Sequence, residues 1–551
     1  MKIKFIFLLF IGFYIAIIVR LFFLQVIYSP ASKSLYLKTN KLYPVRGRIY
    51  DQKNQSLVLN QNSYQLYVEP KKVEDKDKLL NLLSKSLEID EASISAKLDM
   101  TKYWVAIANG LTQEQKDKLD NLNLKGIGFD YQTKRFYPEA SLSAHILGFL
   151  GKDNQNEDIG YLGLEGFYDR DLRGLPGFVE TERDILGRPI LIGVQQRVEA
   201  EDGRDLILTI DKNVQEISKK KLLEGLEKYQ AKKGCVITAD PKTMAIISLV
   251  CLPDYDLEKY YLFNENFYKN LAISDLYEPG SVFKPLIVAA ALEEKKIKPD
   301  ETYNETGQVA VGEYNIKTWN DKYEGKISMT RILEKSSNVG MVYIGEKLGN
   351  KNISKYLQKY GFGQNTGIDL EGEAGGYLKP TAEWYPIDYA TVTFGQGIAV
   401  TPIQMIRAFA SIINGGYLMK PYVVQKIISK NKTTEIKPKI ERRIVSQLTS
   451  DIIRKMLVST VENAEAKWDR PKGFAIGGKT GTAQVPIKGI YDASKTIASF
   501  IGFAPANDPK FLTFVVLYEP KSSQWGSETA APLFFEIAKQ LIVYYNISPN
   551  R

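Results

Sequence analysis

An apolar run at the N-terminus constrains the fold of this chain more than any other feature. Residues 5–19, FIFLLFIGFYIAIIV, carry no charge, and the apolar character resumes after Arg20 and continues to Tyr28. A run of this length fits a membrane span of roughly 20 residues and is long for the core of a secretory signal peptide. A cleaved signal is the alternative, because residues 29–31, SPA, faintly resemble a cleavage site. We expect an uncleaved, single-pass anchor.

Charges around this run indicate its direction in the membrane. Lys2 and Lys4 precede it and favour a cytoplasmic N-terminus, and on this interpretation the body of the protein lies outside the membrane. Arg20 is costly in the middle of a bilayer, so it either extends to the surface or faces a polar neighbouring span. The argument is weakened by three lysines that follow the run, Lys33, Lys38 and Lys41.

Length and composition indicate a globular protein of several domains and exclude some functions. The 551 residues are enough for about two or three domains, and 44% apolar with 25% charged residues is typical of globular chains. The formal net charge of +9 is spread along the chain, and no zinc finger or arginine tract accompanies it, which disfavours nucleic acid as a partner. With one histidine and two cysteines, a Cys/His metal site is excluded, and no cofactor is expected.

The two cysteines, Cys235 and Cys251, lie at opposite ends of an expected hairpin, GCVITADPKTMAIISLVC. A disulfide between them is possible, but it cannot be read from the sequence. Two buried free thiols are the preferred interpretation.

Sequence patterning divides the chain into three parts. Residues 1–30 form the cytoplasmic tip and the anchor. Residues 31–200 contain strand-like and turn-like pieces around a small α+β insertion at 71–127, which is rich in Lys, Asp, Glu and Leu and has helical spacing in places. Residues 201–551 form a second unit, which begins with an alternating strand in DGRDLILTID.

The expected C-terminal domain assembles its sheet from distant segments. Two early strands, VITAD and IISLV, form a hairpin, and the late candidates are FAIGGKTGTAQV, TIASFIGFAP and FLTFVVLYEP. Helices occupy the middle of the domain, and a last helix, APLFFEIAKQLIVYYN, closes the chain. The fold class is therefore mixed α/β (α+β), with a five-stranded, mainly antiparallel sheet flanked by helices.

The stretch EPGSVFKPLIVAAALEE, residues 278–294, places Ser281 and Lys284 on one face at the start of an apolar helix. Helix capping by Ser281 is the simplest interpretation. A lysine, however, is electrostatically misplaced in the first turn, where the helix dipole is positive. An amine in a poorly solvated site is pushed towards its neutral form, and it can then accept the serine proton and create a nucleophile. A Ser-His-Asp enzyme would have to use His145, and no G-x-S-x-G elbow accompanies it.

Two further short motifs follow Ser281 along the chain. EKSSNVG contains Ser336 and Asn338, and GGKTGTAQ contains residues 479–482. Each motif alone is typical of a turn, a cap or a strand end. In this order, S-x-x-K, S-x-N and K-T-G resemble the three motifs of the penicilloyl-serine transferases, which include penicillin-binding proteins and β-lactamases.

The N-terminal half extends the resemblance. PVRGRIYD, RFYPEASLSAHILGFLG and GLEGFYDRDLRG resemble motifs of class B penicillin-binding proteins, in which they build a non-catalytic, dimerisation-type pedestal. ASFIGFAP and AAPLF are closer to the septal, FtsI-like branch. The resemblance therefore implies a pedestal at 31–200 and a transpeptidase domain at 201–551. The family's early hairpin usually reads DPKTG, whereas Met244 replaces the glycine here, so we expect this turn to close differently, without the positive φ that glycine tolerates.

The resemblance implies a serine-type D,D-transpeptidase that crosslinks peptidoglycan stem peptides in cell division and is a target of β-lactams. Ser281 would attack the penultimate carbonyl of a D-Ala-D-Ala donor with Lys284 as base, and the backbone N–H groups of Ser281 and Thr482 would form the oxyanion hole. The other expected site residues are Ser336 and Asn338, for proton relay and the substrate amide, Lys479, for positive charge, and the substrate-binding residues Thr480, Gly481 and Thr482.

Partners and location also follow from the resemblance. It implies a polytopic, FtsW-like glycosyltransferase and other division proteins as partners. It places the chain in a bacterial cytoplasmic membrane, with the catalytic domain on the outer, periplasmic side.

Other functions share parts of this pattern. A D,D-carboxypeptidase or a β-lactamase would let water release the acyl group, but none of Glu371, Glu373 and Glu383 can be assigned to that step. A β-lactam sensor usually has several membrane spans, and the sequence has one. A non-catalytic scaffold of the division machinery has no reason to keep Ser281, Lys284 and Lys479 together.

Overall fold

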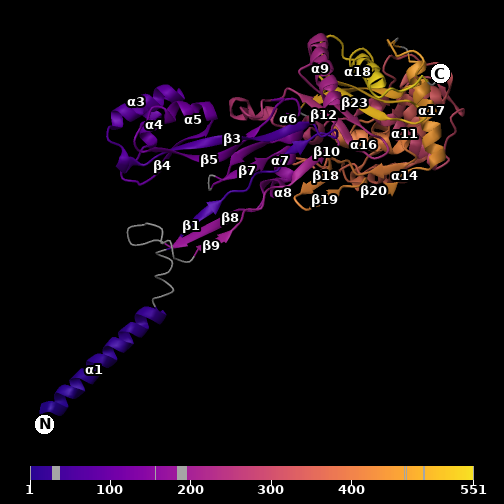
Figure 1. The fold of residues 1–551 in the computed structure, drawn as a ribbon. Coiled ribbons are helices and arrows are strands. Elements are labelled where there is room, and N and C mark those ends of the chain that lie inside the picture. Colours follow the sequence, from indigo (N-terminus) through magenta and orange to yellow (C-terminus); the bar gives the residue numbers. More distant parts are fainter. Residues whose placement is uncertain are drawn as a thin grey trace. The chain divides into compact units, whose positions relative to one another are not determined.

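The computed structural model describes most of the chain, and the described residues form two compact units (Figure 1). One unit contains residues 1–47 and 170–204, and the other contains residues 48–169 and 205–551. The possible cleavage site at 29–31 and Lys33 lie outside the described residues. The structure describes residues 2–27, 37–154, 157–182, 195–464, 466, 468–487 and 490–549.

The first unit contains the apolar helix. Helix α1 (Lys2–Phe22) continues as a π-helix at Phe23–Ile27, and the side chains of residues 4–26 are exposed. Within the described residues it is the one helix long and apolar enough to cross a membrane, which agrees with the single span predicted from the sequence. The rest of the unit includes the short helix α8 (Asp169–Arg173) and a three-stranded antiparallel sheet in the order β1 (Leu37–Leu42), β8 (Gly177–Glu182) and β9 (Gln195–Val198).

A seven-stranded sheet begins the second unit and combines segments that are far apart in sequence. Its helices lie within the segment predicted to be an α+β insertion, and leucines from them pack on strand residues such as Leu66 and Val105. The strand order is β19 (Lys432–Glu435), β18 (Val424–Ser429), β10 (Asp205–Leu208), β2 (Ile49–Tyr50), β3 (Ser56–Val68) and β4 (Val105–Leu111), with β5 (Ile127–Phe136) also paired to β3. The helices are α3 (Lys76–Leu87), α4 (Glu91–Lys97) and α5 (Gln113–Asp120).

The central sheet of the second unit has five strands, all antiparallel, and confirms the predicted assembly of early and late segments (Figure 1). Continuous apolar runs such as FLTFVVLY become strands with every residue buried, because both faces of the sheet are covered. The order is β12 (Ile246–Leu252), β11 (Lys233–Ala239), β23 (Phe511–Tyr518), β22 (Ile490–Ala504) and β21 (Gly477–Ile487).

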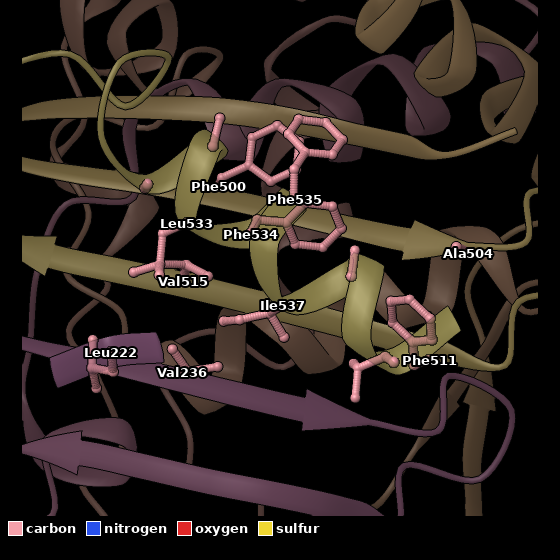
Figure 2. Packing of buried hydrophobic residues seen from close by; sticks show 14 of the residues in the cluster. Leu222, Val236, Phe500, Ala504, Phe511, Val515, Leu533, Phe534, Phe535 and Ile537 are labelled. Atoms are coloured by element: carbon pink, nitrogen blue, oxygen red, sulfur yellow. The ribbon is translucent and has the colours of Figure 1, made fainter. Parts of the chain in front are cut away.

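The two terminal helices of this domain pack on the sheet and form its main core. In Figure 2, α18 (Ala530–Tyr544) crosses the strands and presents Phe534 and Phe535 to Phe500. The ring centroids of Phe500 and Phe534 are 4.7 Å apart, and burial of each such ring contributes about 1.5–3 kcal/mol. Helix α9 (Lys212–Tyr229) adds Leu222 to the same cluster.

The remaining elements of the second unit lie in the sequence either before the early hairpin or between it and the late strands. They include two helices that meet at the candidate site, and a buried helix, α16, whose residues are all shielded from solvent. The helices are α6 (Ala144–Leu147), α7 (Gly163–Phe167), α10 (Leu271–Ser274), α11 (Lys284–Glu293), α12 (Met329–Lys335), α13 (Asn338–Leu348), α14 (Asn350–Tyr360), α15 (Pro386–Val392), α16 (Pro402–Ile413) and α17 (Gln447–Glu462). Short strands form four separate pairs: β6 (Phe149–Lys152) with β7 (Asp158–Tyr161), β13 (Thr302–Glu305) with β16 (Gly325–Ser328), β14 (Val309–Val311) with β15 (Tyr314–Ile316), and β17 (Tyr417–Met419) with β20 (Ile440–Arg443).

The turn between β11 and β12 corrects one expectation. Met244 itself adopts a left-handed backbone conformation, with φ 58°, so the turn closes with a positive φ, contrary to the expectation from the sequence. The Met244 side chain is fully buried, and its N–H donates to the Asp240 carbonyl over 2.8 Å. Burying a methionine contributes about 1.5–3 kcal/mol, which offsets the roughly 1–2 kcal/mol cost of the left-handed conformation.

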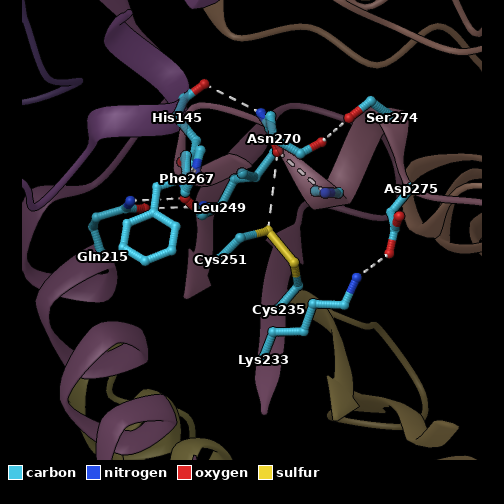
Figure 3. Close-up of a disulfide and its surroundings, with 11 residues drawn as sticks. His145, Gln215, Lys233, Cys235, Leu249, Cys251, Phe267, Asn270, Ser274 and Asp275 are labelled. Atoms are coloured by element: carbon cyan, nitrogen blue, oxygen red, sulfur yellow. Dashed lines mark hydrogen bonds and ion pairs between the residues drawn. A yellow bond between two sulfur atoms is a disulfide. The ribbon is translucent and has the colours of Figure 1, made fainter. Parts of the chain in front are cut away.

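The same hairpin corrects the expectation of free thiols. Cys235 and Cys251 form a disulfide, because the register places them directly opposite each other on β11 and β12 (Figure 3). Both residues are buried on the sheet face opposite to Val236 and Val250, which belong to the core under α18. The hairpin was predicted from the sequence, but its register was not, and only the register decides whether the two sulfurs meet.

We expect the disulfide to stabilise the domain measurably. The Cys235→Ala/Cys251→Ala double variant should lose about 3 kcal/mol of unfolding free energy, as estimated from loop-closure entropy for a loop of this size. Thermal unfolding with and without a reductant measures this loss, and the reductant should affect the wild type but not the variant. Labelling of denatured, unreduced wild-type protein with a maleimide should find no free thiol; two labelled thiols would contradict the bond.

Candidate active site

Ser281 lies on a tight turn beside a cavity. Residues Gly280–Phe283 form a short 3-10 helix, and α11 begins at Lys284, three residues later than the sequence suggested for a helix start at Ser281. The Ser281 hydroxyl caps neither helix, so the capping interpretation is wrong. Ser281 is partly exposed and lines a cavity of about 380 Å³. Within the described chain, no side chain makes a hydrogen bond to its Oγ.

Lys284 follows this turn, is fully buried, and extends to the loop between α12 and α13. Its Nζ donates to the carbonyl oxygen of Ser336, to Ser336 Oγ over 3.1 Å and to Asn338 Oδ1 over 2.8 Å. Burial lowers the pKa of Lys284 well below its usual value, the positive charge of Lys479 lowers it further, and Glu305 opposes this shift. The amine therefore gives up a proton more easily than a free lysine does.

Ser336 lies at the junction of two helices. Helix α12 ends there, and Ser336 adopts the left-handed conformation at φ 59°. Ser337 then caps α13, because its hydroxyl accepts the Gly340 N–H over 2.9 Å. This sharp turn directs Ser336 Oγ to a position within 3.1 Å of the Lys284 Nζ and 3.0 Å of the Lys479 Nζ.

The third motif lies on β21, at the edge of the central sheet. Gly481 permits β21 to approach the Ser281 turn, since a Cβ atom there would lie 2.9 Å from a Val282 methyl group and 2.4 Å from Ser499 Oγ. Lys479 Nζ also donates to the Thr480 carbonyl over 3.2 Å and to the Thr480 hydroxyl over 3.3 Å. Burial lowers the pKa of Lys479 to about 7.

The structure brings the residues of the three motifs together around one cavity. Lys284 contacts two of the residues that line the cavity, Ser336 and Asn338. Gly481 has no side chain, and its backbone lies next to the Ser281 turn. The cavity itself is lined by the other predicted site residues, Ser281, Ser336, Asn338, Lys479, Thr480 and Thr482.

His145 and the three alternative carboxylates do not line this cavity. His145 is buried elsewhere, where its Nε2 lies 2.8 Å from the Phe267 carbonyl (Figure 3). Its ring also contacts Tyr255. Burial lowers the pKa of His145. Glu373 accepts hydrogen bonds from the backbone and hydroxyl of Thr366. Among the described residues, no group of His, Cys, Asp and Glu side chains is arranged to hold a metal ion.

Sequence motifs did not point to several other residues of the cavity. Trp319 and Trp525 come from distant segments, and their ring centroids lie 5.1 Å apart at the cavity. The Trp319 Nε1–H donates to the Lys335 carbonyl over 3.2 Å, and the N–H of Gly526, next to Trp525, donates to Thr482 Oγ1 over 3.0 Å. No pattern in the sequence marks these tryptophans, because only the folded chain brings them together.

Comparison with known proteins gives consistent matches. Residues 234–539 match the family described as the penicillin binding protein transpeptidase domain, and residues 41–208 match the penicillin-binding protein dimerisation domain. The chain is 33% identical to stage V sporulation protein D of Bacillus subtilis, over 95% of this chain and 82% of that protein. It is 30% identical to the peptidoglycan D,D-transpeptidase FtsI of Buchnera aphidicola, over 97% of this chain and 94% of that protein.

Solved structures share the fold. Penicillin binding protein 2X from Streptococcus thermophilus superposes with a TM-score of 0.76 at 24% identity, covering 92% of this chain and 80% of that one. A peptidoglycan synthetase from Bifidobacterium adolescentis superposes with a TM-score of 0.75 at 25% identity, covering 94% of this chain and 98% of that one.

Proposed function

Because the chain belongs to the penicillin-binding protein family and carries its transpeptidase domain at residues 234–539, we infer that it is a serine-type peptidoglycan D,D-transpeptidase acylated on Ser281. Relatives named peptidoglycan D,D-transpeptidase match it over 94% of their own length. The observation that carries the assignment of the site is the Ser336 hydroxyl, which lies between the Nζ atoms of Lys284 and Lys479 beside the Ser281 turn.

Acylation begins with Lys284 in its neutral form. Its Nζ accepts the hydroxyl proton of Ser281 as Oγ attacks the penultimate carbonyl carbon of a stem peptide that ends in D-Ala-D-Ala. Hydrogen bonds in the substrate-free site are often longer than in the complex, so the absence of a Ser281–Lys284 bond is compatible with this role. The backbone N–H groups of Ser281 and Thr482 stabilise the oxyanion, and each such donor is worth about 3 kcal/mol.

Collapse of the tetrahedral intermediate releases the terminal D-Ala. The amino group of the leaving D-Ala takes a proton that passes from Lys284 through the Ser336 hydroxyl. In the substrate-free site this hydroxyl contacts the Lys284 Nζ. An amine from a neighbouring stem peptide then attacks the ester carbonyl, forms the crosslinking amide and restores the Ser281 hydroxyl. Lys479, with the Thr480 and Thr482 hydroxyls, binds the substrate carboxylate, and β-lactams carry the same group. Asn338 holds the substrate amide.

Hydrolysis is the alternative reaction of such an acyl-enzyme. None of Glu371, Glu373 and Glu383 lines the cavity, which argues against any of them as the residue that activates water. A non-catalytic scaffold role is disfavoured because the buried lysines at the site are costly for the fold and serve no purpose without acylation. A β-lactam sensor would be acylated and then stop. It usually has several membrane spans, whereas the described residues contain one helix able to cross a membrane. Transfer to an amine is therefore the favoured second step.

We expect benzylpenicillin to form a covalent adduct on Ser281, because this hydroxyl is the nucleophile. Intact-mass analysis should show one adduct on the wild type and none on folded Ser281→Ala, and a fluorescent penicillin gives the same comparison on a gel. An adduct that persists on folded Ser281→Ala would contradict the assignment of Ser281 as the nucleophile. A stem-peptide donor mixed with a D-amino acid acceptor should yield the transfer product in excess over the hydrolysed peptide.

The two buried lysines should differ in their tolerance of arginine. Lys284→Arg should lower the acylation rate by about 10²–10⁴-fold, since guanidinium remains protonated and cannot act as a base. Lys479→Arg should be milder, because its site needs charge.

The pH profile separates the same roles. In the free enzyme acylation should fall as the pH rises through about 7, where Lys479 loses its proton and its positive charge. Lys479→Arg should remove this falling limb. Stopped-flow acylation across the pH range measures both effects, and near-normal acylation by Lys284→Arg would exclude Lys284 as the base.

The domain division and the location are part of the proposal. Residues 1–30 form the tip and anchor, 31–200 the pedestal and 201–551 the transpeptidase domain, and the match of residues 41–208 to the dimerisation domain supports this division. We place the body of the protein outside the cytoplasmic membrane. The Cys235–Cys251 disulfide supports this side, since such bonds persist in oxidising compartments and are rare in the cytosol.

A polytopic, FtsW-like glycosyltransferase is the proposed partner of the anchor in cell division. All described side chains of the span are exposed, and Arg20 within it gains from a polar neighbour. Replacing residues 1–28 by an unrelated single span should therefore leave penicillin acylation unchanged and impair division in cells. Acylation of the purified protein and septation of complemented cells measure the two effects. Normal septation would mean that the span is only a tether.

A further inference from the structure

A buried carboxylate lies behind the loop that carries Ser336. Glu305 ends strand β13, where it pairs with Gly325 of β16, and it is 1% exposed. Its Oε1 accepts the hydroxyl proton of Ser337, and its Oε2 lies 3.8 Å from the Nζ of Lys335. Glu305 is therefore in contact with the residues on both sides of Ser336 and does not line the cavity itself.

The contact with Ser337 fixes the direction of a single proton. A serine hydroxyl has one proton to donate and lone pairs to accept. Because Ser337 donates its proton to Glu305, its oxygen is oriented to accept the Gly340 N–H that starts α13. The carboxylate thereby fixes the cap of α13, and with it the position at which Ser336 leaves the preceding helix.

The contact with Lys335 fixes the other side of the loop. The Lys335 ammonium is buried, and it donates to the Lys322 carbonyl over 3.2 Å and lies 3.3 Å from Glu324 Oε1. Its own carbonyl accepts the Trp319 Nε1–H. A buried ammonium needs a compensating charge, and Glu305 and Glu324 supply it from β13 and from the residue before β16.

We propose that Glu305 is a positioning residue of the acylation site: it holds the Lys335–Ser337 loop so that Ser336 Oγ stays between the Nζ atoms of Lys284 and Lys479. This inference rests on the proposed acylation of Ser281. Ser336 is held in a left-handed conformation that costs about 1–2 kcal/mol for a residue with a side chain, and such a conformation persists only when its surroundings determine it.

Glu305 also acts on the charge of the base. The charged groups around Lys284 are Lys479, which lowers its pKa, and Glu305, which raises it, whereas its hydrogen-bond partners Ser336 and Asn338 are neutral. Lys335 faces Glu305 from the other side. Removing the negative charge while keeping the hydrogen bond should therefore lower the pKa of Lys284, so that more of the base is neutral at low pH.

Two substitutions separate these effects from simple loss of stability. Glu305→Ala removes both the acceptor and the charge, and a misplaced catalytic group of this kind can cost about 100-fold in rate. Glu305→Gln keeps an oxygen that accepts the Ser337 proton, but it removes the charge and places an NH2 group where Oε2 faces Lys335. Glu293→Gln is the matched control: Glu293 also accepts hydroxyl protons, from Ser446 and Thr449, at the far end of α11.

The experiment measures the second-order rate of acylation by a fluorescent penicillin from low to high pH, with the full-length wild type and the three variants. We expect Glu305→Ala to be about 100-fold slower than the wild type. Glu305→Gln should recover much of the rate, and the rising limb of its profile should move to lower pH. Glu293→Gln should match the wild type in rate and profile, whatever its melting temperature.

The other possible results of this experiment also decide for or against the role of Glu305. The inference is overturned if Glu305→Ala acylates at the wild-type rate, or if Glu305→Gln is as slow as Glu305→Ala with its rising limb unmoved. If Glu305→Ala does not fold, the profile of Glu305→Gln decides: a shifted rising limb supports the inference and an unmoved one overturns it. Failure of the wild type to be acylated at all would instead contradict the proposed function.

Discussion

The proposed chemistry depends on two lysine side chains that are buried within hydrogen-bonding distance of one hydroxyl group. Lys284 and Lys479 are both shielded from solvent, and Ser336 Oγ lies 3.1 and 3.0 Å from their Nζ atoms. Two ammonium groups this close cannot both remain charged in a poorly solvated site at low cost, so at least one of them gives up its proton more easily than a free lysine. Burial and the nearby positive charge therefore lower the pKa of Lys284, and burial lowers that of Lys479, which is what the proposed base and carboxylate-binding group require.

The fold brings these two lysines together from different elements, α11 and β21, so that each has its own surroundings. Lys284 starts a helix buried along its length, which desolvates the amine, whereas Lys479 extends from the edge strand β21. The edge strand reaches the Ser281 turn only because Gly481 has no side chain. The central sheet holds this strand in register through β22 and β23, and those strands are covered by the aromatic core of α18 (Figure 2). Distant parts of the chain therefore carry the proposed base, Lys284, and the proposed anion-binding group, Lys479, independently.

Sequence patterns predicted what depends on residue type and order. The fixed spacing of three motifs singled out five residues that the structure brings together: Ser281, Lys284, Ser336, Asn338 and Lys479. The strands of the central sheet and the final helix were predicted correctly because their apolar runs are long. The failures concern register and tertiary context. The sequence shows a hairpin but not that Cys235 opposes Cys251. It also gives no reason for Met244 to take a left-handed conformation, whose cost is offset by burial of its side chain. Glu305 escaped notice because a single carboxylate on a short strand has no motif.

The active site contains features that oppose folding. Ser336 has a left-handed backbone, three lysines at or beside the cavity are almost completely buried, and the one buried carboxylate behind them, Glu305, is shared between Ser337 and Lys335. Each would be removed by selection for stability alone, since buried charges and left-handed side-chain residues are unfavourable. They are held by rigid neighbours: the cap of α13, the short β13–β16 pair and the edge of the five-stranded sheet. The stability of the core is therefore what allows a hydroxyl and two amines to remain in an arrangement that an isolated segment would not adopt, and loosening any of these supports should impair the chemistry before it unfolds the domain.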